Sequence, residues 1–235
     1  MVFLFLWNKK KDYKSKVDGG ITNNNLEDKK KESKPKIGGD IASYNLEDWW
    51  LNDLTEEERK TVKEIFLPFG SDNTIDEGKV YPQSISDKVR FLGNLAHWFQ
   101  KPEYYTIAKK ILNEAEKYID EVDSILTLHF YYLNCLEVHY RNRNEDKDAL
   151  DLAIEYCKKQ ISISKETKKA FKEQEPHEDL PLHTGYKQLA IIYEKQGNIE
   201  EALKITKEAL KERWNKEDCI KRIARLKKKL LKDKK

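Results

Sequence analysis

The chain has 235 residues, which is enough for one large domain or two small ones. Hydrophobic residues make up 38% of it and charged residues 37%, and a mean hydropathy of −0.86 is too polar for a membrane-embedded protein. Nine Gly and six Pro are few for this length, which disfavours sheet-rich and loop-rich folds. We therefore expect an all-α protein.

The first residues and the cysteines indicate the compartment. The apolar run MVFLFLW is only seven residues long, and Lys9, Lys10 and Lys11 follow it. A signal peptide carries its positive charges first, and a membrane-spanning helix needs about 20 apolar residues. The three Cys form no CxxC spacing and are an odd number. The sequence therefore predicts a cytoplasmic protein without a membrane partner.

Charge is distributed unevenly along the chain. Residues 9–36 have a net charge of +5 and residues 207–235 a net charge of +8, which leaves −10 on the remainder. Basic ends bind nucleic acid or anionic surfaces through counterion release. Lys-rich helix ends also complement the helix dipole and maintain solubility. Both interpretations remain open, although the scarcity of aromatic residues between the lysines disfavours nucleic acid.

Three regions follow from composition and helix signals. Residues 1–45 are predicted as a flexible basic leader, 46–88 as an N-terminal capping segment and 89–235 as a helical repeat domain. The leader contains GGITNNNLED at 19–28 and an approximate copy, GGDIASYNLED, at 38–48; the second copy is expected to dock on the folded body. Thr55 and Glu58 form a capping box that starts a helix, and helices are expected again from Ser84 onward.

One spacing of apolar positions recurs three times. Each copy has large apolar residues on a first predicted helix and then a small Ala that begins the apolar stripe of a second. Because small residues allow close helix contact, each copy predicts a helical hairpin, with Gly197 and Asn144 as left-handed turn residues. The copies are Leu92, Leu95, Ala96, Phe99, Ala108, Leu112 and Ala115; Leu133, Leu136, Glu137, Tyr140, Ala149, Ala153 and Tyr156; and Tyr186, Leu189, Ala190, Tyr193, Ala202, Thr206 and Ala209.

The third copy, YKQLAIIYEKQGNIEEALKITKEAL, resembles the tetratricopeptide (TPR) repeat family, and the resemblance extends over residues 89–212. The segment HTGYKQLAIIYEKQG is also similar to the C-terminal end of uncharacterised bacterial and phage TPR-type proteins. The resemblance implies an α-solenoid, an array of antiparallel helical hairpins with capping helices. The copies are offset by 41 and 53 residues and not by the 34 of the family, so the additional residues extend helices or form loops such as Gln174–Leu182.

A final helix is expected from Asn215 to about Leu231, as a cap on the array. Asn215 is predicted as its N-cap. Its apolar face is predicted to consist of Ile220, Ile223, Ala224, Leu230 and Leu231.

No arrangement of residues in the sequence predicts catalysis. The motifs of phosphate-binding loops, zinc proteases and serine hydrolases are missing from the sequence. Cys135 and His139 lie one helical turn apart, but no further ligands have a spacing that predicts a metal site. We therefore expect a protein that is not an enzyme and holds no metal or cofactor.

The resemblance to TPR arrays implies a peptide-binding concave face lined by the first helix of each hairpin. Five of the residues at these positions are Lys or Arg and one is acidic, which favours an acidic peptide. The positions are Arg90, Gly93, His97, Gln100 and Lys101; Tyr131, Asn134, Val138, Arg141 and Asn142; and Thr184, Lys187, Ile191, Glu194 and Lys195.

The expected function is that of a scaffold or adaptor that binds another protein or a peptide on this concave face. Two alternatives remain open at the level of sequence. The first is a regulatory sensor whose hairpins shift when a peptide binds. The second is association with nucleic acid or an anionic surface through the basic ends. Neither the partner nor the oligomeric state follows from the residues.

Overall fold

The computed structural model describes residues 36–68 and 74–232. The chain divides into two units, Met1–Lys36 and Ile37–Lys235. Most of the predicted leader, including GGITNNNLED, lies outside the described residues. The described residues of the second unit form helices and connecting turns without a strand, which confirms the all-α class for this part of the chain.

Eleven α-helices and two short 3-10 helices occur in the described ranges. In chain order they are α1 (Gly39–Ser43), α2 (Glu47–Asn52), α3 (Glu56–Ile65), α4 (Ile85–Trp98), η1 (Pro102–Tyr104), α5 (Tyr105–Glu116), η2 (Ile119–Glu121), α6 (Ile125–Arg141), α7 (Ala149–Ser162), α8 (Ser164–Gln174), α9 (Thr184–Lys195), α10 (Ile199–Lys211) and α11 (Lys216–Lys232). None of these helices, among the residues that are described, is long and apolar enough to cross a bilayer.

Residues 38–45 were predicted as the end of the leader but belong to the folded unit. The backbone N–H groups of Gly38 and Ile41 donate to the carbonyls of Asp76 and Ile75, at 2.8 and 3.1 Å. Ile41 is completely buried, and Gly39 has a left-handed φ of 56° that suits glycine. The predicted docking of the second copy, GGDIASYNLED, on the folded body is thus confirmed. The folded unit begins before the predicted leader boundary at residue 45.

Local signals set the starts of several helices as the sequence predicts. At α3 the Thr55 hydroxyl accepts from the Glu58 N–H at 3.2 Å, while the Glu58 carboxylate accepts from the Thr55 N–H at 2.7 Å. This is the predicted capping box. The Ser84 hydroxyl accepts from the Asp87 N–H and starts α4 in the same manner.

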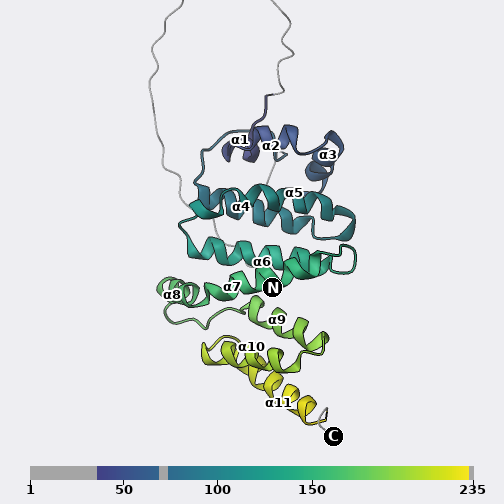
Figure 1. Ribbon diagram of the computed structural model, residues 1–235. Helices are drawn as coiled ribbons and strands as arrows, with labels where there is room; N and C mark the ends of the chain where they lie inside the picture. Colours follow the sequence, from purple (N-terminus) through teal and green to yellow (C-terminus); the bar gives the residue numbers. More distant parts are fainter. Residues whose placement is uncertain (1–35, 69–73, 233–235) are drawn as a thin grey trace, which may run out of the picture. The chain divides into compact units, whose positions relative to one another are not determined.

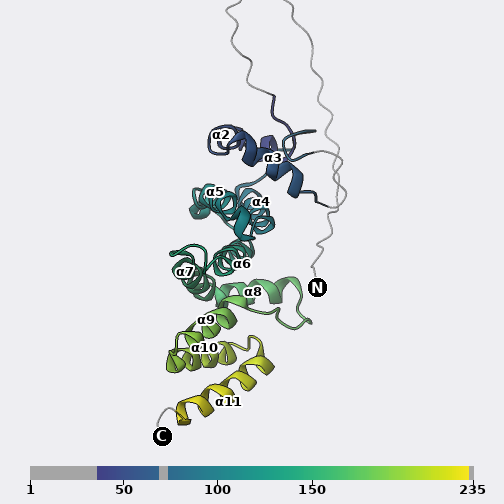
Figure 2. The same ribbon diagram turned by 90° about the vertical axis from the view of Figure 1, so that its right-hand side faces the viewer.

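The helices of the repeat copies pack in sequential pairs. α4 packs with α5, α6 with α7 and α9 with α10, while α4 also contacts α6 and α7 contacts α9. Figures 1 and 2 show these pairs following one another in chain order, with α11 last. The small residues predicted to permit close helix contact are at most 1% exposed: Ala96, Ala108, Ala149, Ala190 and Ala202.

The additional residues between the second and third copies form both a helix and a loop. α7 ends at Ser162, and α8 begins two residues later and packs against α6. The chain then returns through residues 175–183 to α9, in agreement with the loop predicted over Gln174–Leu182. The helix α8 itself was not predicted as a separate element.

One of the two predicted left-handed turn residues differs from the structure, and Asn215 lies at the predicted start of α11. Gly197 has the expected left-handed φ of 81°, but Asn144 does not; among the described non-glycine residues only Asn45, Arg213 and Asn215 have positive φ. Asn215 lies directly before α11, and its side-chain oxygen accepts from the His183 N–H at 3.1 Å. Its side chain therefore ties α11 to the start of α9.

The inner face of α11 also differs from the prediction. Cys219, Arg222 and Leu226 are buried, whereas Ile220 and Leu231 are 51% and 68% exposed. The helix is rotated because its basic residues reach a carboxylate on α9, which is described below.

Candidate functional site

A cavity of about 320 Å³ lies between α4, α6 and α9, the first helices of the three repeat copies. Four predicted positions come together in it: His97 of α4, Gln100 just after α4, Arg141 of α6 and Thr184 of α9. We call this cavity the α4–α6–α9 cleft. Its lining residues are His97, Gln100, Leu136, Glu137, Tyr140, Arg141, Thr184 and Gln188.

A hydrogen-bond chain connects the residues at the cleft. The Arg141 guanidinium donates to Gln100 Oε1 at 3.3 Å, and Gln100 Nε2 lies 3.1 Å from His97 Nε2. Because arginine only donates, the Gln100 carbonyl oxygen has to face Arg141 and its amide nitrogen has to face His97. This orientation of the amide makes His97 Nε2 the acceptor and leaves a ring proton on Nδ1.

That Nδ1–H is directed to Glu137. The distance from His97 Nδ1 to Glu137 Oε2 is 3.5 Å, so this is an electrostatic contact and too long for a good hydrogen bond. Burial raises the pKa of Glu137, and the neighbouring His97 lowers it to a lesser extent. Glu137 is the single carboxylate among the lining residues.

Two cations contact Tyr140, which lines the cleft. Lys195 Nζ donates to the Tyr140 hydroxyl at 3.1 Å, and the Arg143 guanidinium carbon lies 4.3 Å from the centre of the Tyr140 ring. With Arg141, three cations lie in or beside the cleft against one carboxylate. The predicted site residue Lys195 thus contributes indirectly, through Tyr140.

The α4 and α6 residues also pair directly across the helix interface. Asn134 Nδ2 donates to Asn94 Oδ1 at 3.1 Å, one turn before the His97–Glu137 contact. Gln100 and Arg141 make the next contact along the same interface. The predicted groove residues of these two helices therefore partly satisfy one another.

Two predicted groove residues and Gly93 have structural positions instead. Tyr131 is 1% exposed, and its hydroxyl donates to Glu116 Oε1 at 3.0 Å. Asn142 is fully buried, and its amide donates to the Gln100 carbonyl at 2.9 Å. A Cβ on Gly93 would lie 3.1 Å from the Tyr131 ring. The helices α4, α5 and α6 approach one another too closely at this point to leave a groove. These residues instead form contacts between the helices.

Glu194 is likewise engaged within the protein. Its carboxylate accepts from Arg225 at 2.5 Å and from Lys229 at 2.6 Å, and Arg222 lies 3.9 Å away. All three cations belong to α11. Glu194 therefore anchors the last helix and is not a groove residue.

The other predicted site residues lie outside the cleft lining. Arg90 is exposed and pairs with Asp87 on its own helix, and Lys101 is exposed just before η1. Lys187 is half-buried on α9, next to Gln188.

Glu137, Tyr140 and Gln188 were not predicted as site residues. The first two occupy repeat positions that the sequence assigns to the core, but both are only half-buried. Gln188 follows Thr184 by one helical turn, so the predicted position of Thr184 together with helical spacing would have indicated it.

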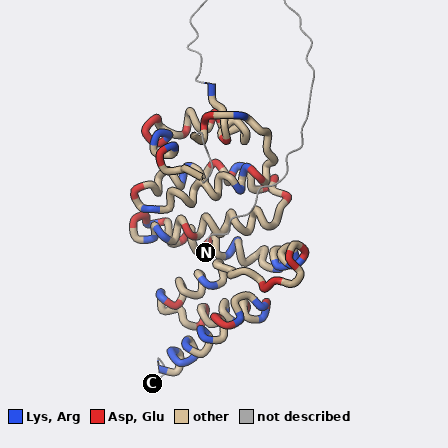
Figure 3. Tube along the Cα trace, turned by 180° about the vertical axis from the view of Figure 1, so that it is seen from behind, with Lys and Arg blue, Asp and Glu red and all other residues tan. Residues whose placement is uncertain are grey.

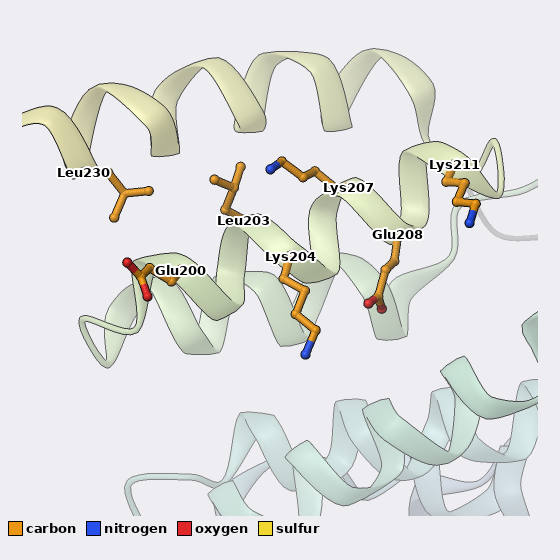
Figure 4. Close-up of a pocket in the computed structure, with 7 residues that line it drawn as sticks. All are labelled: Glu200, Leu203, Lys204, Lys207, Glu208, Lys211 and Leu230. Atoms are coloured by element: carbon orange, nitrogen blue, oxygen red, sulfur yellow. The ribbon is translucent and has the colours of Figure 1, made fainter.

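A second cavity, of about 440 Å³, lies between α10 and α11. Leu203 of α10 and Leu230 of α11 are directed into the space between the helices, and Lys207 and Lys211 lie along it (Figure 4). Glu200 and Glu208 on the same helix offset part of this charge. No predicted site residue lines this cavity.

Metal-ligating side chains do not gather in threes anywhere in the described ranges. Cys135, Cys157 and Cys219 are free and buried, and burial raises the pKa of each thiol. His139 Nδ1 bonds to the Tyr105 hydroxyl at 2.8 Å, so the predicted Cys135–His139 spacing serves core packing. Comparison of the chain with protein-family models, curated proteins and solved structures finds no match.

Proposed function

We propose that this chain is a non-catalytic scaffold or adaptor, a TPR-like array of helical hairpins that binds a protein or peptide segment across α4, α6 and α9. One observation carries the proposal: three helices from three separate repeat copies contribute polar side chains to the same cleft. Gln100 and Arg141 occupy equivalent positions of the first two copies, and Thr184 and Gln188 reach the same cleft from the start of α9. The burial of the repeated Ala positions is consistent with hairpin packing.

The proposal predicts loss of partner capture when the charge at this face is reversed. The full chain, immobilised, is exposed to native lysate at moderate salt, and retained proteins are identified by mass spectrometry. A variant with Arg141→Glu and Lys187→Glu should retain at least about tenfold less of a discrete partner, since charge-assisted hydrogen bonds are lost and like charges are introduced. Helicity by circular dichroism should be unchanged, because both side chains are at the surface of their helices.

A matched variant distinguishes an effect at this face from an effect of the net charge of the protein. Lys158→Glu with Lys165→Glu makes the same change of charge on α7 and α8, at exposed positions away from the cleft. Equal capture by the two variants would overturn the assignment of the face.

A second candidate function is favoured by the basic surface of α11. Lys221, Lys227, Lys228 and Lys232 are exposed on it, and Figure 3 shows Lys and Arg recurring along this helix. Such a surface would bind nucleic acid or another polyanion through counterion release. In the same capture experiment, retained nucleic acid that is lost as salt rises, without any discrete protein, would support this candidate instead.

A further inference from the structure

The groups at the α4–α6–α9 cleft that still lack partners are donors. Gln188 Nε2 is buried without a hydrogen-bond partner among the described residues, and so is His97 Nδ1. The Arg141 guanidinium has five N–H groups, of which one is directed to Gln100. An unpaired buried donor is unfavourable, so an acceptor that enters the cleft and pairs with it is favoured.

We propose that the α4–α6–α9 cleft binds a carboxylate of the ligand, with the Arg141 guanidinium and the Gln188 amide as its donors. The inference rests on the proposed function and names the anchoring group of the bound segment. A carboxylate has two oxygens and about four lone pairs, so it can accept from both of these donors at once. Planar guanidinium groups bind carboxylates with two parallel hydrogen bonds.

The charges around the cleft favour an anion. Arg141 lines the cleft. Lys195 and Arg143 contact Tyr140, which also lines it. The negative charge of Glu137 would repel an anion. Its Oε2, however, lies 3.5 Å from Nδ1 of His97, which belongs to α4. Glu194, the other acidic side chain nearby on α9, is neutralised by α11.

Gln100 is a positioning residue for this site. It accepts from Arg141 with its oxygen and donates to His97 with its nitrogen, so it orients the guanidinium without carrying charge. A glutamate at this position would supply a carboxylate from the chain itself. The variant Gln100→Glu should therefore occupy Arg141 and exclude a ligand carboxylate while the fold is retained.

The inference is tested by titrating the isotope-labelled full chain with small probes, followed by NMR. The probes are N-acetyl-aspartate N-methylamide and N-acetylglycine, which carry a side-chain and a terminal carboxylate. Their neutral counterparts are N-acetyl-asparagine N-methylamide and N-acetylglycine N-methylamide. A carboxylate probe should shift the backbone resonances of Tyr140, Thr184 and Gln188 and bind at least about tenfold more tightly than its neutral counterpart.

Variants of the cleft residues test the contribution of each anchoring group to binding. Arg141→Met and Gln188→Met keep the length of each side chain and remove its donors, and each should weaken binding of the carboxylate probe by about tenfold. Gln100→Glu should remove binding. Lys158→Met removes an exposed cation of α7, outside the lining, and should leave affinity within about twofold.

The outcomes distinguish this inference from the proposed function. Equal affinity for carboxylate and neutral probes at the cleft would overturn the carboxylate inference and leave peptide binding intact. Tight binding that survives Arg141→Met and Gln188→Met would also overturn it. If no probe shifts a cleft resonance, the inference fails, and the proposed function is then decided by the capture experiment alone. Stronger binding of one carboxylate probe identifies the source as side chain or chain terminus.

Discussion

Two glycines, one in α9 and one in the turn after it, illustrate different constraints on a single residue. Gly197 has a left-handed φ of 81° and open space around it, so only its backbone conformation requires glycine. Gly185 is required by packing at the first turn of α9. A Cβ there would lie 2.7 Å from Gln160 Oε1 and 3.0 Å from the Cys157 carbonyl oxygen. The same Gln160 oxygen accepts from the Gly185 N–H.

Alanine at these two positions should therefore cost different amounts of stability. Gly185→Ala should lower the free energy of unfolding by about 1–3 kcal/mol, because α9 has to move away from α7. Gly197→Ala should cost about 1 kcal/mol, from backbone strain alone. Urea unfolding of each variant measures the difference. A Gly185→Ala variant as stable as the parent would contradict the close approach of α7 and α9.

At the scale of elements, one carboxylate holds α11 against α9. The Glu194 side chain is 12% exposed and contacts Arg222, Arg225 and Lys229. Burial by itself would raise the pKa of Glu194, but hydrogen bonds from Lys229 and Arg225 bring it below the ordinary value. Arg222 is buried as well, and its other carboxylate partner is Asp218.

Removal of this charge should loosen α11 selectively. Glu194→Gln removes one of the two carboxylates that neutralise the buried Arg222. It should lower the free energy of unfolding by about 1–3 kcal/mol. Amide hydrogen exchange in α11 should accelerate more than in α4–α7. Glu201→Gln is the matched control, since it removes an exposed pair with Lys204 at 3.6 Å that is worth at most about 0.5 kcal/mol. Equal exchange in the two variants would show that Glu194 does not hold the helix.

Across the whole described unit, three buried histidines make stability depend on pH. Burial lowers the pKa of His129 and His139 to about 4 and that of His183 to about 3, where the charge of His129 adds to the effect. The rings of His129 and His183 lie 5.3 Å apart, and His183 packs on Trp214. These contacts connect α6 with the start of α9 and the turn before α11.

Stability should therefore fall as the solution becomes acidic. In the unfolded chain these histidines bind protons near pH 6.5, whereas the native chain binds them only near pH 3–4. Stability is thus complete above pH 6.5 and declines below it, by about 2–4 kcal/mol per pH unit near pH 5. The raised pKa values of Asp40 and Glu137 oppose this trend, since protonation favours the native state there.

Chemical denaturation between pH 4.5 and 8 measures this dependence. His139→Phe keeps the ring stacked on Tyr156 and removes one titrating group. It should reduce the slope by about one third, although it costs the hydrogen bond to Tyr105. A free energy of unfolding that stays constant over this range would contradict the burial of neutral histidines.

The sequence by itself determined the helical class, the capping box at Thr55 and Glu58, and the left-handed turn at Gly197. These features depend on neighbours within a few residues, so local pattern is sufficient for them. The resemblance to TPR arrays also pointed to His97, Gln100, Arg141 and Thr184, which the structure brings together in one cleft.

Only the tertiary structure decided which of the predicted residues are available to a ligand. Tyr131 and Glu116 are 15 residues apart, and Glu194 meets α11 across more than 30 residues. Such partners depend on helix rotation and on loop lengths between copies, which short-range periodicity does not specify. For the same reason the orientation of α11, with Ile220 and Leu231 exposed, followed from packing and not from the local pattern.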